Sequence, residues 1–497
     1  MSQLKYNVIA NFVGKGWTGI MGLAFIPIYI KFIGIEAYGL VGFSATFQAL
    51  SSLLDMGLSS TLNRELAVRS TQEGKGQESR DLVRTLEIVY WLATIVVCLI
   101  IISLAPLLAE SWINSKQLSK ESLQLAIVLM GVVIACQFPF SLYSGGLLGL
   151  QRQVLLNGIT IVMSTLRGVG VILVLWLVSP TIQAFFIWQA FVSLLQTLVT
   201  AGFLWKSLPK SSVRSCFRKD LWLGIWRFAA GMTGISLVSI ILMQTDKIIL
   251  SKMLSLEEFG YYNLAGTVAS GISTVVAPVF TSVFPRFSEL VAQGEKEKLV
   301  DLYHKSCQLL SVIVLPICVT VSLFSKDILL IWTGSPVIAE KSYLLVSLLV
   351  IGTSLNGLMN VPYALQLAYG WTELALYINI VAISVLIPSL FWLTSHYGAI
   401  GAASVWVILN AGYVLIGIRF MYARLLKGEM FHWYYEDITR PLIGAMLVGL
   451  CLSSIRYSHH LFHMNIGWIS IVILTTHLGS VLSTEVTSRK IQSFLLK

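Results

Sequence analysis

The sequence is short of charge and of catalytic signatures. Charged side chains make up 12% of its 497 residues, whereas soluble domains carry roughly 25%. The chain contains no P-loop, no His-Glu-x-x-His, no Asp-x-Asp of the glycosyltransferase type and no Ser/His/Asp set. Because each of these motifs assembles the groups of a known reaction, their absence argues against an enzyme. The low charge excludes an ordinary soluble domain.

Cysteine is also scarce, and none of it is spaced like a metal site. The six cysteines are Cys98, Cys136, Cys216, Cys307, Cys318 and Cys451. No pair forms a Cys-x-x-Cys motif, so we interpret them as small apolar residues. Three histidines, His459, His460 and His463, cluster without a nearby cysteine or carboxylate and indicate a solvated loop. The sequence therefore predicts no metal site and no cofactor.

Apolar residues are abundant instead, at 56% of the chain, with a mean hydropathy of +0.79. A bilayer-spanning helix needs about 20 apolar residues, and about fourteen such runs recur from end to end. They are 8–30, 37–58, 84–109, 122–148, 154–178, 182–205, 222–250, 259–284, 306–332, 343–367, 374–394, 399–423, 441–457 and 465–484. We therefore predict an all-α polytopic membrane protein whose first span is retained rather than cleaved.

The basic residues give this bundle an orientation. Most of the 34 lysines and arginines fall in alternate loops, beginning with the loop between the second and third spans. The positive-inside rule then places both termini in the cytoplasm. The same asymmetry accounts for the net charge of +10, so no nucleic-acid partner is predicted.

An internal repeat divides the chain. Lys31–Gly39 matches Lys252–Gly260 position by position, with the lysine, a glutamate and the glycine identical and the aromatic residue kept in kind. Both copies join an odd-numbered span to the next one. Six spans per repeat predict two pseudo-symmetric lobes related by an axis along the membrane normal. The predicted parts are 1–205 with spans 1–6, 206–424 with spans 7–12, and 425–497 with two additional spans.

Several spans carry one polar face. Asn11 and Lys15 lie four residues apart on the first span, and Gln48 and Asp55 share a face of the second. A lipid-facing helix would not expose such groups to hydrocarbon, so we expect the polar faces to surround a central cavity. Its candidate residues are Lys15, Arg167, Asp55, Asp246, Asn11, Gln48, Asn263 and Asn356.

Each charged candidate has a structural alternative. Lys15 is either a cavity cation or a lysine that extends its amine to the inner interface. Arg167, near mid-bilayer, either faces an anionic substrate or pairs with a carboxylate. Asp55 either binds substrate or a coupling ion, or forms an ion pair with Lys15. Asp246 and Lys247 point about 100° apart, so only one of them can face the cavity squarely, and we favour Asp246.

Three arginines lie at predicted cytoplasmic edges, namely Arg64, Arg227 and Arg286. They are either topology anchors or a first contact for an anionic headgroup at a cytoplasmic gate.

The whole-length pattern resembles the MOP superfamily, and more narrowly its O-antigen and capsular polysaccharide flippases. The segments that carry the resemblance are Phe32–Gly39, Leu54–Ser59 with Arg64, Gln244–Ser251 and Phe259–Tyr262. The resemblance implies a MOP/MATE-like fold and a location in the bacterial cytoplasmic (inner) membrane.

The activity that the resemblance implies is flipping of undecaprenyl-pyrophosphate-linked oligosaccharide from the inner to the outer leaflet by alternating access. It also implies membrane lipids as partners, other polysaccharide-assembly membrane proteins as further candidates, and coupling to H⁺, Na⁺ or the membrane potential. Two alternatives stay open. A MATE-type cation antiporter has the same fold, although its cavity should be acidic or neutral. A membrane polysaccharide polymerase should have a large outer loop, and none is predicted.

Overall fold

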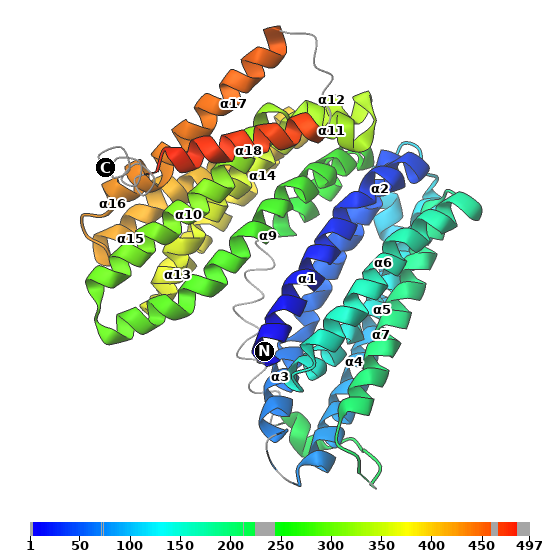
Figure 1. Ribbon diagram of the computed structural model, residues 1–497. Coiled ribbons are helices and arrows are strands. Elements are labelled where there is room, and N and C mark those ends of the chain that lie inside the picture. The colour runs from blue at the N-terminus through cyan, green and yellow to red at the C-terminus, as the bar shows by residue number, and fades with distance from the viewer. Residues whose placement is uncertain are drawn as a thin grey trace. The chain divides into compact units, whose positions relative to one another are not determined.

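A computed structural model of the protein describes residues 3–70, 72, 74–211, 213–223, 244–458 and 466–484. Over these residues the chain is helical, and its β-structure is limited to one isolated bridge between Asn114 and Ser255. The chain divides into two compact units, Met1–Gly260 and Tyr261–Lys497, whose helices are labelled in Figure 1. We describe each unit by itself.

The first unit consists of long helices with short connections. They are α1 (Gln3–Ala24), α2 (Ile26–Ser51), the 3₁₀ turn η1 (Ser52–Asp55), α3 (Leu58–Arg69), α4 (Gly76–Leu107), the π-helical turn η2 (Leu108–Trp112), α5 (Lys120–Gly149), α6 (Gln153–Leu177) and α7 (Ile182–Ser207). Residues 244–253 are also helical. Helix α5 is central, since it packs against α3, α4 and α7.

The second unit has the same character. Its helices are α9 (Leu256–Gln293), which starts in the first unit, α10 (Lys296–Leu323), α11 (Ser325–Thr333), α12 (Pro336–Leu358), α13 (Asn360–Ala368), α14 (Glu373–Gly412), η3 (Tyr413–Gly417), α15 (Ile418–Arg424), α16 (Met430–His432), η4 (Trp433–Thr439), α17 (Arg440–Ser458) and α18 (Ile466–Leu482). The last two helices pack on each other and on α10. A hydrogen bond of 3.0 Å between Thr320 and Thr476 joins α10 to α18.

Local sequence signals set several helix boundaries. Ser119, Thr181 and Ser335 are N-caps whose hydroxyls accept from a backbone N–H three residues on. Gly34 interrupts α2 with a φ of 82° and Gly398 interrupts α14 with a φ of 57°, values that favour glycine. Both glycines lie where the sequence predicts a connection between spans.

Ten described helical segments are long and apolar enough to cross a membrane. On α4, the side chains of Leu92, Ile95 and Leu99 are each more than half exposed, as expected of a helix that faces lipid. The prediction of a multi-pass helical membrane protein is confirmed. The count of fourteen spans and the 1–205, 206–424 and 425–497 division stay predictions.

The two copies of the repeat contact each other at their glycines. A Cβ atom at Gly39 would lie 2.5 Å from the carbonyl oxygen of Leu256, and one at Gly260 would lie 2.4 Å from the carbonyl oxygen of Ile35. Position 39 of the first copy thus meets the residue equivalent to Ile35 in the second copy, and the reverse contact is also made. The two short segments therefore make the same contact in both directions.

The glutamate of the first copy and the lysine of the second copy form hydrogen bonds near this contact. The buried Glu36 carboxylate accepts from the Ser115 hydroxyl at 2.7 Å and from the Lys116 and Gln117 backbone N–H groups. Lys252 donates to the carbonyl oxygen of Ser111. Glu36 therefore holds the segment that follows η2, and Lys252 holds η2 itself.

We predict that Gly39→Ala and Gly260→Ala each lower the thermal stability of the purified protein. Each added methyl group would force two backbones apart, and overpacking of this kind costs about 1–3 kcal/mol. Gly271→Ala is the matched control, because a Cβ atom there meets nothing within 4 Å. A melting temperature in Gly39→Ala equal to that of Gly271→Ala would contradict the proposed close contact.

Candidate functional site

A guanidinium lies among neutral acceptors inside the first unit. Arg167 projects from α6 toward α5 and α7. Its nitrogens donate to the Gln189 oxygen at 3.3 Å, the Ser193 hydroxyl at 3.2 Å and the Gln196 oxygen at 3.1 Å, with Gln137 at 3.5 Å. No carboxylate of the described residues pairs with Arg167, so its positive charge is solvated by amides and a hydroxyl rather than neutralised.

Arg167 opens onto a polar cavity of about 270 Å³. A second cavity, of about 340 Å³, has Asp55 in its wall. Gln48 and Gln137 line both cavities, and we call the two together the polar groove. Another hollow, of about 630 Å³ on α6 and α7, is lined almost wholly by apolar side chains and holds no charged residue.

Asp55 lies at the other end of the polar groove. Met56 and Gly57 follow it with φ values of 48° and 73°, so the chain turns sharply between η1 and α3. The Asp55 carboxylate accepts from the hydroxyls of Ser59 at 2.8 Å and Ser141 at 3.1 Å, and from Tyr90. Within the described part of the chain Asp55 forms no ion pair, so the Lys15–Asp55 pair considered from the sequence is not formed there.

The polar face of the first span is divided between two environments. Asn11 accepts from the Asn157 amide of α6 at 2.6 Å. A Cβ atom at Gly14 would overlap that same Asn157 side chain, so α1 and α6 approach closely here. Lys15 is exposed and lines neither cavity of the polar groove.

The remaining candidates lie elsewhere. Asn356 donates to Asn410 at 2.9 Å and thereby joins α12 to α14 in the second unit, and Asn263 is buried near the start of α9. Asp246 lies in the helical residues 244–253 of the first unit. Neither cavity of the polar groove is lined by any of these three residues.

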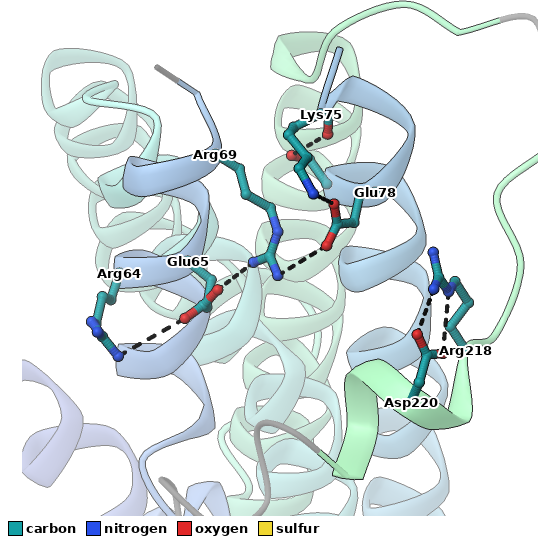
Figure 2. A network of polar contacts seen from close by, with 8 residues as sticks. Arg64, Glu65, Arg69, Lys75, Glu78, Arg218 and Asp220 are labelled. Atoms are coloured by element: carbon teal, nitrogen blue, oxygen red, sulfur yellow. Dashed lines mark hydrogen bonds and ion pairs between the residues drawn. The ribbon is translucent and has the colours of Figure 1, made fainter. Parts of the chain in front are cut away.

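The candidate edge arginines form local ion pairs. Arg64 lies 3.9 Å from Glu65, which begins the chain of charges that Figure 2 shows across α3 and the start of α4. Arg69 links Glu65 at 2.5 Å to Glu78 at 3.5 Å. Arg286 pairs with its helix neighbour Glu289 at 2.5 Å. Arg227 lies outside the described residues.

A separate exposed pair follows α7. Arg218 hydrogen-bonds Asp220 and holds the pKa of that carboxyl below its usual range. Exposed pairs of this kind contribute little to stability, so we assign Arg218 and Asp220 no part in the site.

Sequence reasoning finds some of the groove and misses other parts. Gln189, Ser193 and Gln196 recur at helical spacing and are visible as a polar face of one span. Gln137 and Tyr90 are missed, because each stands alone in an apolar run and gives no periodic signal.

Two protein-family models and a bacterial protein of known sequence match this chain. The family described as polysaccharide biosynthesis protein matches residues 4–291, and a family described as MatE matches residues 233–392. A Shigella flexneri protein provisionally assigned as an O-antigen transporter is 22% identical over 432 residues, which are 86% of this chain and 99% of that protein.

Solved structures show the same fold at low identity. The lipid II flippase MurJ, in an inward closed conformation, aligns with a TM-score of 0.68 and 15% identity over 98% of this chain and 99% of its own. An inward-facing multidrug resistance MATE family transporter of the MOP superfamily aligns with a TM-score of 0.62 and 14% identity over 83% and 94%. The predicted MOP/MATE-like fold is confirmed.

We predict that Asp55→Asn lowers the melting temperature in detergent. The amide replaces a carboxylate that accepts three hydroxyl hydrogen bonds, and bonds to charged groups contribute about 1.5–3 kcal/mol each. Glu121→Gln at the exposed start of α5 is the control for loss of one negative charge. If both variants melt with the wild type, the hydroxyl cluster around Asp55 does not stabilise the fold.

Proposed function

This chain belongs to the family of polysaccharide biosynthesis proteins, and we propose that it moves a lipid-linked oligosaccharide across the membrane. It acts as a transporter and makes or breaks no covalent bond. The proposed substrate is an undecaprenyl-pyrophosphate-linked repeat unit of O-antigen, capsule or exopolysaccharide. The proposed direction is from the inner to the outer leaflet of the bacterial cytoplasmic membrane.

The observation that carries this proposal is Arg167 in the polar groove. An arginine held open by neutral acceptors can give them up to an anionic oxygen, and its planar fork suits phosphate groups. A pyrophosphate is therefore the part of the substrate that we assign to Arg167. Amides and hydroxyls along the groove, such as Gln48, Gln137 and Ser141, are suited to sugar hydroxyls.

The proposed mechanism is alternating access of two lobes, 1–205 and 206–424, with 425–497 as an addition and both termini in the cytoplasm. Lys15, Asp246, Asn11, Asn263 and Asn356 stay candidates for the walls of the pathway, and Arg64, Arg227 and Arg286 for its cytoplasmic gate. Proposed partners are the membrane lipids and other polysaccharide-assembly membrane proteins, and proposed coupling ions are H⁺ and Na⁺.

A second candidate function has its own support. The MatE family matches 233–392, and Asp55 places a carboxylate in the polar groove. A cation antiporter would use that carboxylate rather than Arg167. The two functions therefore predict opposite sensitivities of transport to the two residues.

Depletion of the protein from cells that make surface polysaccharide tests the proposed function. We expect loss of surface glycan, with lipid-linked repeat units accumulating in the cytoplasmic leaflet. Repeat units that reach the outer leaflet without being polymerised would point to a polymerase. Normal glycan together with altered sensitivity to cationic drugs would favour the antiporter.

We predict that Arg167→Ala abolishes glycan export at a normal level of membrane insertion, and that Arg167→Lys restores it in part. A lysine keeps the charge but loses the planar fork that holds several acceptors at once. Arg152→Ala is the matched control, because Arg152 is an exposed arginine at the start of the same helix. Full export in Arg167→Ala, or equal loss in Arg152→Ala, would remove Arg167 from the mechanism.

A further inference from the structure

A second cluster of ionisable side chains lies in the second unit, and the proposed transport does not use it. His304 comes from α10, His432 ends α16 and Asp437 lies in η4. One nitrogen or oxygen atom from each lies within 4.8 Å of those of the other two. Two imidazoles and a carboxylate that converge in this way form a set of donors typical of a transition-metal site.

The π-helical turn η4 brings two of these residues together. His432 and Asp437 are five residues apart, and on a regular α-helix they would point about 140° away from each other. A π-helix bonds residue i to residue i+5, which brings such a pair onto one face, and π-turns occur frequently at functional sites. Nε2 of His432 lies 4.0 Å from Oδ1 of Asp437.

The neighbouring side chains fix the orientation of the cluster. Gln308, one turn from His304 on α10, donates to Oδ1 of Asp437 at 3.1 Å. Nδ1 of His304 lies 2.6 Å from Oδ2 of Asp437, and its Nε2 lies 3.3 Å from Glu429. Histidines that bind metals usually give their second ring N–H to a carboxylate, and Glu429 holds that place here.

Burial separates this cluster from an ordinary surface ion pair. Asp437 is fully buried and His304 is 8% exposed, whereas the side chain of His432 is 39% exposed. The cluster is thus rigid on the α10 side and accessible on the α16 side. An ion can reach the cluster past the partly exposed His432. The three side chains would occupy three coordination positions, and water would occupy the fourth.

We propose that His304, His432 and Asp437 bind a divalent transition-metal ion of the zinc class. Tetrahedral ligands about 2.1 Å from Zn²⁺ lie about 3.4 Å from one another. The observed separations from Asp437, 2.6 Å to His304 and 4.0 Å to His432, lie on either side of that value. All three donor atoms lie within 4.8 Å of one another, so small side-chain shifts complete the geometry. Nitrogen donors disfavour Mg²⁺ and Ca²⁺, which take oxygen ligands.

The role that follows is structural. The ion joins α10 to the segment that leads through α16 and η4 into α17. Because α17 and α18 both pack on α10, the metal would fix the start of α17 against α10 and so stabilise the packing of the last two helices. This inference does not depend on the proposed transport function.

Zinc titration of the purified full-length protein tests the proposal. Chelator-treated protein in detergent is titrated with Zn²⁺ by calorimetry, and with Co²⁺ by visible absorption as a readout of tetrahedral nitrogen and oxygen coordination. We expect one ion per chain and a rise in melting temperature on Zn²⁺ addition. His432→Ala should weaken binding by more than about tenfold, and Gln308→Ala by about 10–100-fold.

The control is His396→Ala, since His396 is an exposed histidine that bonds only to its own helix backbone. Zinc binding should be unchanged in this variant. His432 is partly exposed, so we expect His432→Ala to fold. If it does not fold, Glu429→Gln replaces it in the zinc titration, because Glu429 contacts the second ring nitrogen of His304. Equal zinc affinity in the wild type and His432→Ala, or absence of binding in both, would overturn the site.

Discussion

The packing of α5, α6 and α7 in the first unit depends on giving the guanidinium of Arg167 protein acceptors for its hydrogen bonds. An arginine within an apolar bundle carries a large desolvation cost unless its N–H groups find acceptors. Here α7 supplies Gln189, Ser193 and Gln196 at successive turns, and α5 supplies Gln137. These helices must therefore keep one relative rotation, because a turn of about 100° by any of them would remove its acceptors. The same rotation leaves Gln137 of α5 facing the polar groove.

The repeat imposes a second constraint. Gly39 and Gly260 meet the backbone of the opposite copy at a distance that leaves no room for a side chain. The contact therefore requires both copies. A side chain added at either glycine would push the opposite backbone away, and movement of one helix alone would not remove the overlap. The Glu36 and Lys252 hydrogen bonds add side-chain contacts around this close backbone crossing. Two similar short segments thus make a contact that needs both of them.

Much of this arrangement could be predicted from the sequence, and the reasons for the rest are physical. Gly34 and Gly398 interrupt their helices where the apolar runs are interrupted, because a change of direction needs a residue that tolerates positive φ. The acceptors of Arg167 on α7 recur at helical spacing, so the sequence predicts that they share a polar face. The sequence does not predict a polar role for Tyr90, because a single tyrosine in an apolar run resembles any core aromatic residue. Its hydroxyl contacts Asp55, which lies on a different helical segment, so no local sequence pattern indicates this contact.

The cluster around Asp437 shows the same limit more sharply. His304 and His432 stand far apart in sequence, and the π-helical turn that aligns His432 with Asp437 leaves no periodic mark. His459, His460 and His463, which lie outside the described residues, give the stronger sequence pattern because they stand close together in the chain.

The two polar clusters also differ in whether a charged side chain has a partner that can carry the opposite charge. Asp437 is matched by His304 and Gln308, so that cluster closes on itself and can fasten helices together. Arg167 is surrounded by neutral acceptors, and Asp55 at the other end of the groove is surrounded by hydroxyls. The polar groove therefore keeps a positive end and a negative end. An anionic group that enters it is favoured at Arg167 and disfavoured at Asp55, so under the proposed function the pyrophosphate would enter with a defined orientation and the uncharged sugars would extend along the amides between them.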